Sequence, residues 1–279
     1  MKSQKNRSFN IGEIIKYVVL GIGSLVMVFP FIWMLLTSLK TLQESESLPP
    51  TFFPTEWMWS NYAEAFEVAP FGHYFVNTII IATIGAALTV VLTVLAAYAF
   101  AVYNFKGKNI LFAAFLMTMM VPAELLIIQN YVTVAQLGWI DTYQGIILPL
   151  LVSGFYIFMA REYFVQTPAV LFKAAYVDGC SGWKYLWKVM IPMNKNAIAT
   201  IGILSFISYW NTFMWPLMVT NSDKFRPLSI GLLNFNYTMG SFANMQMAGA
   251  TIVLMPMIVF YLIFHKQIIS GVSRSGIKG

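Results

Sequence analysis

Glu124 is the acidic residue that could do chemistry inside an apolar stretch of this 279-residue chain. Gln129 and Asn130 follow it by roughly one and two helical turns. A charge at mid-bilayer costs about 2.5–3.5 kcal/mol on insertion scales, so such a carboxylate normally faces a cavity or a partner. The three side chains either line a polar path or, if Glu124 lies near the external end of its span, are simply hydrated. Because the span that holds Glu124 carries no second acid and no basic partner, support for an ion-coupled transporter is weak.

Recognisable nucleotide-binding and metal-binding patterns are absent from the sequence. Gly107-Lys108 lacks the upstream glycine of a phosphate-binding loop, and zinc-helix, nucleophile-elbow and dinucleotide patterns do not occur. His73 and His265 lie far apart, and the single cysteine, Cys180, excludes an intrachain disulfide and a Cys/His metal cluster. The chain therefore shows no means of hydrolysing ATP, and active transport would draw its energy from another chain or from an ion gradient.

Residues 168–192, called the docking segment below, interrupt the apolar pattern with several basic side chains. The basic residues within and just beyond it are Lys173, Lys184, Lys188 and Lys195. Between them lies a compact apolar set that would form one face of a short helix. This set comprises Ala169, Phe172, Ala174, Ala175 and Val177. The segment is predicted to be either a rigid docking element or an interfacial helix lying on the lipid surface.

Local signals divide the docking segment into two short helices. Thr167 is expected to cap the first, with Pro168 at its first position. Asp178-Gly179 should end that helix, because glycine readily adopts the backbone angles of a tight turn. Ser181 is expected to cap a second helix, which Pro192 would end. The prediction is a helical hairpin with an Asp-Gly turn.

The composition predicts that the rest of the chain is membrane-embedded. Hydrophobic residues make up 58% and charged residues 10% of the sequence, far below the roughly 25% charged in soluble domains. The net charge of +6 could suggest a nucleic-acid partner, but the basic residues border apolar segments instead of lining a polar face, so no nucleic-acid binding is expected. The first apolar run, at about 14–36, is too long for a signal peptide, and no cleavage site follows it.

Six apolar segments are long enough to span a bilayer as helices, which need about 20 residues. They lie at about 14–36, 74–102, 109–132, 143–160, 197–219 and 244–265. Prolines at or within several of them would bend the helices. They are Pro30, Pro122, Pro149, Pro216 and Pro256. Small residues, including Gly85, predict close helix packing in the second span. We therefore expect a single all-α membrane domain over residues 1–279.

Lysine and arginine positions predict the orientation of these spans. With the N-terminus in the cytoplasm, every Lys and Arg except Lys40, Lys224 and Arg226 falls on the cytoplasmic side. The cytoplasmic set includes Lys2, Lys5, Arg7, Arg274 and Lys278 near the two termini. Six spans return the C-terminus to the cytoplasm, so the two termini and a loop at 161–195 are expected there. A long loop at 37–73 and a loop at 220–240, which contains Tyr237, should be external.

Several motifs resemble the inner-membrane permease family of ATP-binding cassette (ABC) importers. The signature of that family is Glu-Ala-Ala, three residues and Gly, with a hydrophobic-Pro pair downstream. Here it is matched by residues 173–179, whose Ala174, Ala175, Asp178 and Gly179 fit, and by Ile191-Pro192. Further motifs are similar to the carbohydrate branch, in particular to the second permease of maltose-type heterodimers. These are Asn77-Thr78, Ala97-Tyr98-Ala99-Phe100, Trp210-Asn211, Pro216-Leu217 and the tail at 271–279.

The resemblance implies a type I importer fold with six spans and a cytoplasmic coupling loop. It also implies partners: a homologous second permease, two nucleotide-binding ATPase subunits that carry ATP and Mg, and an extracellular or periplasmic solute-binding protein. The location would be the bacterial cytoplasmic (inner) membrane, and this chain would bind no cofactor. One departure is Lys173, which stands where the family has Glu. The change of charge leaves the contact that this position makes with the ATPase subunit in doubt. It predicts an acidic or neutral residue opposite Lys173 on the ATPase.

The mechanism implied by the family is alternating access, with an oligosaccharide or disaccharide as substrate. Family sugar sites use aromatic stacking and amide hydrogen bonds, so the resemblance implies pathway candidates in this chain. These are Tyr209, Trp210, Asn211 and Trp215, with Glu124 and Gln129 behind them. Helix packing is the alternative role for each. A glycerol-phosphate importer, a secondary transporter and a non-transporting scaffold are the alternative functions.

Overall fold

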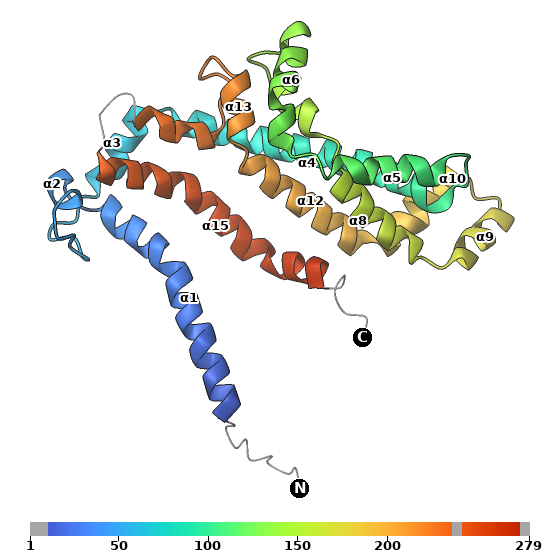
Figure 1. The fold of residues 1–279 in the computed structure, drawn as a ribbon, viewed down its shortest axis with the longest axis horizontal. Coiled ribbons are helices and arrows are strands. Elements are labelled where there is room, and N and C mark those ends of the chain that lie inside the picture. Colours follow the sequence, from blue (N-terminus) through green and yellow to red (C-terminus); the bar gives the residue numbers. More distant parts are fainter. Residues whose placement is uncertain (1–10, 236–241, 274–279) are drawn as a thin grey trace. The chain divides into compact units, whose positions relative to one another are not determined.

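The computed structural model describes residues 11–235 and 242–273, and the chain folds as helices with no strand in these ranges (Figure 1). Side chains at 11, 123 and 268–273 are not described. The predictions for Lys2, Lys5, Arg7, Tyr237, Arg274 and Lys278, and for the last six residues of the tail motif, lie outside the described residues. The chain divides into two compact units, which are described separately. Unit 1 comprises Met1–Ala69 and Leu232–Met255, and unit 2 comprises Pro70–Gly231 and Pro256–Gly279.

Unit 1 begins with α1 (Ile11–Ser38), followed by α2 (Leu42–Ser45) and α3 (Ser60–Val68). The span Gly12–Ser38 has none of its most apolar stretch buried inside the protein, as expected of a helix that faces lipid. Lys40, just beyond it, is 1% exposed. Its ammonium group donates to the carbonyl of Thr51 and lies 4.6 Å from the Trp33 ring centre.

Unit 2 is built around α4 (Phe71–Val102), which packs against α8 (Gly154–Val165) and α12 (Lys195–Trp210). The predicted close packing at Gly85 is confirmed, since a Cβ atom there would lie 2.6 Å from the Tyr209 ring. A side chain at this point would fit between α4 and α12 only if the Tyr209 ring moved.

Three of the six predicted spans are interrupted, so they are not six unbroken helices. The region 109–132 forms α5 (Lys108–Thr118) and α6 (Ala123–Gln136), which Pro122 separates. The region 143–160 forms α7 (Tyr143–Ile147), the 3-10 helix η1 (Leu148–Leu150) and α8, with a 52° bend. The region 197–219 forms α12 and α13 (Met214–Val219). Proline lacks the backbone N–H that continues a helix, which accounts for Pro122 and Pro149 at two of these breaks.

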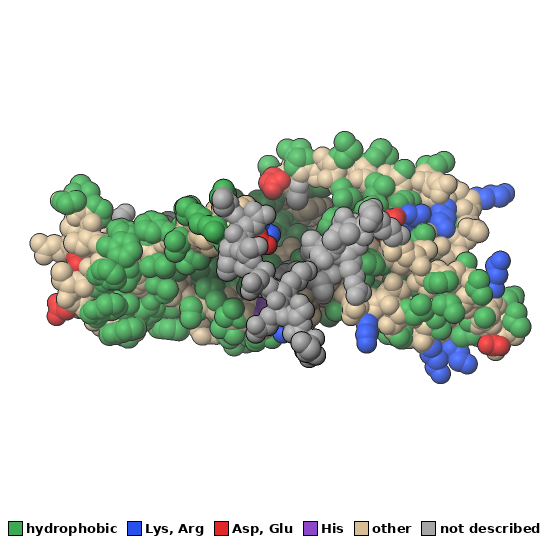
Figure 2. All heavy atoms as spheres, turned by 90° about the horizontal axis from the view of Figure 1, so that it is seen from below, with side chains coloured by type: hydrophobic (Ala, Val, Ile, Leu, Met, Phe, Trp, Pro, Cys, Tyr) green, Lys and Arg blue, Asp and Glu red, His purple; other side chains and the backbone are tan. Residues whose placement is uncertain are grey.

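Helices long and apolar enough to cross a membrane number three in the described residues, or up to five if each bent pair is one span. The last of the three lies in α15 (Ala243–Ser273), which contains Pro256 without breaking. Many large hydrophobic side chains are exposed, and Figure 2 shows hydrophobic patches on the face that it draws. Exposed apolar side chains on this scale mark a protein that meets lipid or partner subunits.

Candidate functional site

The docking segment folds as the predicted helical hairpin, with two corrections. Its first helix, α9 (Ala169–Val177), begins after Pro168, which takes the cap position itself. The expected Thr167 cap is wrong: no side chain caps α9, and the Thr167 hydroxyl accepts a hydrogen bond from the Asn194 amide at 3.1 Å. This hydrogen bond between Thr167 and Asn194 links the two ends of the docking segment. The Thr167 hydroxyl does not cap α9 because it bonds the Asn194 side chain instead of the local backbone.

The turn after α9 follows the sequence prediction. Gly179 has φ +70°, a left-handed conformation that favours glycine over residues with a side chain. The amide of Cys180 closes the turn on the carbonyl of Ala175 at 2.8 Å. Ser181 then caps α10 (Gly182–Tyr185), since its hydroxyl accepts from the amide of Lys184 at 3.3 Å. Asp178 ends α9 as expected.

The second correction concerns Pro192, which does not end the second helix. After α10 the chain continues as the π-helix η2 (Leu186–Met190) and then α11 (Ile191–Met193), with Pro192 in its first turn. Proline is tolerated at this position because the first N–H groups of a helix need no internal partner. The chain bends by 82° between 182–193 and α12. The turn into the next span therefore comes after Met193.

One face of the docking segment is packed into unit 2 and the other is exposed. Tyr185, Leu186 and Met190 are buried in a cluster with residues of α4, α8 and α12. In α9, Phe172 and Ala175 pack against this cluster, whereas Tyr176 is 75% and Val177 84% exposed. Exposed apolar residues supported by a packed interior are typical of a surface that binds another protein or enters a membrane surface. Lys173 is exposed on this same helix.

Helix α4 holds the docking segment through direct contact. The Tyr98 hydroxyl donates to the carbonyl of Gly182 at 2.7 Å. A Cβ atom on Gly182 would lie 2.2 Å from the Tyr103 hydroxyl, so only glycine allows this approach without movement. The ring of Tyr98 also meets Tyr103 edge-on, with centres 5.4 Å apart. The start of α10 is thereby fixed to the C-terminal end of α4.

A polar cavity of about 280 Å³, called the hydroxyl cavity below, lies within unit 2. Its lining residues are Thr89, Leu150, Ser153, Phe155, Tyr156, Ser205, Ser208, Tyr209 and Thr212. Seven of these nine side chains carry a hydroxyl group and none carries a charge. The Thr89 hydroxyl is buried and lies beside Tyr209, with no hydrogen bond of good geometry among the described residues. Hydroxyls that donate and accept beside aromatic rings can bind a neutral polyhydroxylated ligand.

Among the predicted pathway residues, only Tyr209 lines the hydroxyl cavity. Trp210 is buried against Phe206 and Phe75. Trp215 is also buried, and its indole N–H lies 3.2 Å from the carbonyls of Gly145 and Ile146. Both tryptophans thus fill packing roles in the described structure.

The remaining three candidates are exposed: Asn211 follows the last residue of α12, and Gln129 lies within α6. Glu124 is in the first turn of α6, where the helix dipole favours an acid. This position agrees with the hydrated alternative. The sequence analysis missed the other hydroxyl residues, although Ser205, Ser208 and Thr212 follow one another at helical spacing and could have been found by that signal.

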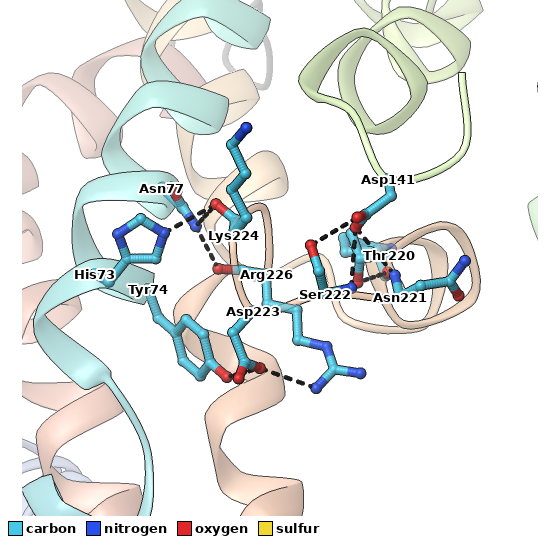
Figure 3. Close-up of polar contacts among 11 residues, drawn as sticks. His73, Tyr74, Asn77, Asp141, Thr220, Asn221, Ser222, Asp223, Lys224 and Arg226 are labelled. Atoms are coloured by element: carbon cyan, nitrogen blue, oxygen red, sulfur yellow. Dashed lines mark hydrogen bonds and ion pairs between the residues drawn. The ribbon is translucent and has the colours of Figure 1, made fainter. Parts of the chain in front are cut away.

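A second polar site lies at the N-terminal end of α4, where residues 220–228, called the clamped loop below, are held from two sides (Figure 3). From one side, Asp141 accepts from the amides of Asn221 and Ser222 at 3.1 Å and from the Ser222 hydroxyl at 2.6 Å. Partial burial works to raise the pKa of Asp141, but these hydrogen bonds and the nearby Arg226 outweigh it and hold the pKa below its usual value. The carboxylate form therefore fixes the loop.

From the other side, the buried Asn77 carboxamide makes three hydrogen bonds. Its amide donates to the carbonyls of Lys224 and Arg226 at 3.0 and 2.9 Å, and its oxygen accepts from the Tyr143 hydroxyl at 2.7 Å. One turn earlier, the Tyr74 hydroxyl donates to Asp223 at 2.6 Å. All four hydrogen-bonding contacts lie within unit 2. They leave the loop backbone little freedom to move without α4.

The long apolar helices, the exposed docking segment and the hydroxyl cavity are features expected of a membrane permease. Residues 90–274 match the family described as the binding-protein-dependent transport system inner membrane component, and the chain belongs to this family. Membership implies, in general terms, a partner permease, an ATPase, a binding protein and a place in the inner membrane. The chain is a transport component rather than an enzyme.

Curated relatives and a solved structure resemble the chain over nearly its full length. The arabinooligosaccharides transport system permease protein AraQ of Bacillus subtilis (strain 168) is 33% identical over 259 residues, 92% of each chain. The sn-glycerol-3-phosphate transport system permease protein UgpE of Yersinia pestis is 27% identical, over 94% of this chain and 96% of its own. A bacterial ABC transporter involved in the import of the acidic polysaccharide alginate has a chain with TM-score 0.80 and 26% identity, covering 95% of this chain and 99% of its own.

Proposed function

We propose that this chain is a permease subunit of an ATP-driven ABC importer for neutral di- or oligosaccharides. It forms the translocation path with a second, homologous permease by alternating access. The observation that carries the proposal is the docking segment, a helical hairpin fixed to α4 on one face and exposed on the other. The docking segment and both termini face the cytoplasm, because this orientation keeps most basic residues on that side.

The docking segment binds an ATPase subunit through its exposed apolar face. Tyr176 and Val177 supply the surface, and the Asp178-Gly179 turn fixes its shape. ATP and Mg belong to the two ATPase subunits, and this chain binds no cofactor. Lys173 meets an acidic or neutral position on the ATPase, since a second basic residue opposite it would repel.

The solute-binding protein delivers sugar from the other side of the membrane, where the clamped loop lies in this orientation. ATP-driven closure of the ATPase subunits moves the docking segment and rocks the two permeases. The sugar must bind the outward and inward states with different affinity if its presence is to shift their equilibrium.

The hydroxyl cavity supplies part of the sugar pathway in this chain. Tyr209 contributes an aromatic ring and Thr89 a buried hydroxyl. The other predicted pathway residues line the path only if the partner permease completes it. They are Trp210, Asn211, Trp215, Glu124 and Gln129. A glycerol-phosphate ester is the second candidate substrate, because a relative carries that name. The uncharged lining favours the neutral sugar, since burying a phosphate without a cation is costly.

Copurification tests the docking role. Gly179→Ala places a side chain at a residue with left-handed backbone angles. The control, Gly72→Ala, makes the same change at a helical residue. At both positions the new Cβ atom has open space around it. We expect the ATPase subunit to copurify with the wild type and with Gly72→Ala, and to be reduced several-fold with Gly179→Ala. Equal recovery from both variants would contradict the role of the turn.

Uptake into proteoliposomes tests the substrate. The assembled complex, with its binding protein, should import an arabino-oligosaccharide in an ATP-dependent manner, and excess glycerol 3-phosphate should not compete. Thr89→Val keeps the shape of the side chain and removes the hydroxyl, so it should lower sugar uptake more than Thr118→Val, whose hydroxyl lies outside the cavity. Competition by glycerol 3-phosphate would favour the phosphate-ester importer.

A further inference from the structure

Helix α4 connects the two functional ends of unit 2 within one unbroken element. It contains 32 residues, which corresponds to about 48 Å at the usual rise per residue. At its N-terminal end it carries Asn77 and Tyr74, which hold the clamped loop (Figure 3). At its C-terminal end it carries Tyr98, whose hydroxyl holds the docking segment at Gly182.

The two helices packed against α4 do not offer the same continuity. Helix α8 follows η1 after a bend of 52°, and α12 ends at Trp210, before the clamped loop begins. The sequence of α4 contains no proline, which is the commonest cause of a sharp helix kink. Helix α4 therefore moves as one rigid element, so a displacement of one end displaces the other end by a similar distance.

Both attachments are made by buried side chains. Tyr98 is 5% and Asn77 1% exposed, and their hydrogen bonds to the docking segment and the clamped loop are partly buried, which reduces competition from water. The Asn77 carboxamide uses its amide and its oxygen at once, which fixes its orientation. Between the two ends, Gly85 brings α4 against Tyr209 of the hydroxyl cavity. Helix α4 therefore contacts the docking segment, the hydroxyl cavity and the clamped loop.

We infer that Tyr98 and Asn77 are positioning residues that make α4 the link between the docking segment and the clamped loop. Through this link, the state of the ATPase side and the state of the binding-protein side bias each other. The inference rests on the proposed function, because it assumes that ATPase and binding protein act at these two ends. Neither residue contacts the transported sugar in this account.

A double-mutant cycle tests the link, with stimulation of ATPase activity by the sugar-loaded binding protein as the readout. Tyr98→Phe removes one hydroxyl, and Asn77→Ala removes the carboxamide; the two sites are about 30 Å apart along the helix. Mutations at such distant sites normally have additive effects. We expect each single variant to lose about fivefold or more of the stimulation, the size of a typical allosteric coupling, and the double variant to lose no more than either single one.

Tyr261→Phe is the matched control, because its ring is exposed on α15 and it should keep full stimulation. If Asn77→Ala does not assemble, Tyr74→Phe replaces it in the cycle. Multiplicative losses in the double variant, or unchanged stimulation in Tyr98→Phe, would overturn the role of α4. A wild-type complex that sugar-loaded binding protein does not stimulate would instead contradict the proposed function itself.

Discussion

The docking segment and the clamped loop are attached to the same helix by different chemistry. The docking segment packs apolar residues such as Leu186 and Met190 into the core and accepts one partly buried hydrogen bond from the Tyr98 hydroxyl. The clamped loop is held mainly by polar side chains, those of Asn77, Tyr74 and Asp141. Hydrogen bonds fix an orientation more strictly than apolar contacts, which are non-directional. The difference indicates that the clamped loop must hold one shape, while the docking segment must offer a surface.

Asn77→Ala should have the largest effect, because it removes the polar attachment of the clamped loop. The Arg226 carbonyl and the Tyr143 hydroxyl would each lose a hydrogen bond, as would the Lys224 carbonyl, which keeps His73 as a second partner; a buried group left unsatisfied costs about 1–3 kcal/mol. We expect a clear fall in the thermal unfolding temperature of the purified protein. Asn221→Ala, at an exposed position of the same loop, is the control. Equal unfolding temperatures for the two variants would show that the clamp does not matter for stability.

Asp141→Asn should have a smaller effect that depends on pH. Because the pKa of Asp141 is lowered in the folded protein, the unfolded chain binds more protons between the two pKa values, and stability rises with pH there. The stabilisation should be complete above the ordinary pKa of about 3.9 and be lost as pH falls below it through the folded value. The measurement is the difference in unfolding temperature between wild type and Asp141→Asn across this window. At neutral pH we expect about 1 kcal/mol, since solvent screens this site; a difference that grew on acidification would have the wrong sign.

Lys173→Glu should have the smallest effect and concerns only the docking segment. An exposed ion pair contributes about 0–1 kcal/mol. Restoring the acid of the family signature should therefore not strengthen the coupling between the docking segment and an ATPase subunit that is adapted to lysine. Stimulation of the ATPase is expected to stay equal or fall modestly. Lys184→Glu, outside the signature but also exposed, controls for net charge. A large gain in stimulation with Lys173→Glu alone would argue against co-adaptation of the partner.

Local features of the docking segment could be predicted from the sequence because neighbouring residues decide them. The turn at Gly179 and the Ser181 cap are confirmed, and each involves residues only a few positions apart. The Thr167 prediction is wrong because Asn194, far along the chain, competes for the hydroxyl. The end of the second helix was predicted wrongly for a different, local reason, since Pro192 is tolerated in the first turn of α11.

The hydroxyl cavity and the clamped loop depend on tertiary contacts that a sequence pattern does not encode. Thr89, Ser153 and Ser208 come from separate elements, and only folding brings them together. Asn77 was noted as part of a family motif, but its three partners are distant in sequence. Sequence reasoning could place the apolar segments and predicted bends at Pro122 and Pro149, but it treated each segment as one span where the structure has separate helices.

Photo-crosslinking from the docking segment tests the central claim most directly. A photoreactive phenylalanine analogue replaces Tyr176, which is 75% exposed, or, as a control, Tyr17, which is 63% exposed on α1. In the intact complex, we predict a crosslink from position 176 to a P-loop ATPase subunit, identified by mass spectrometry, and no such product from position 17. Crosslinks from position 176 to lipid alone would contradict the docking role and favour an interfacial helix.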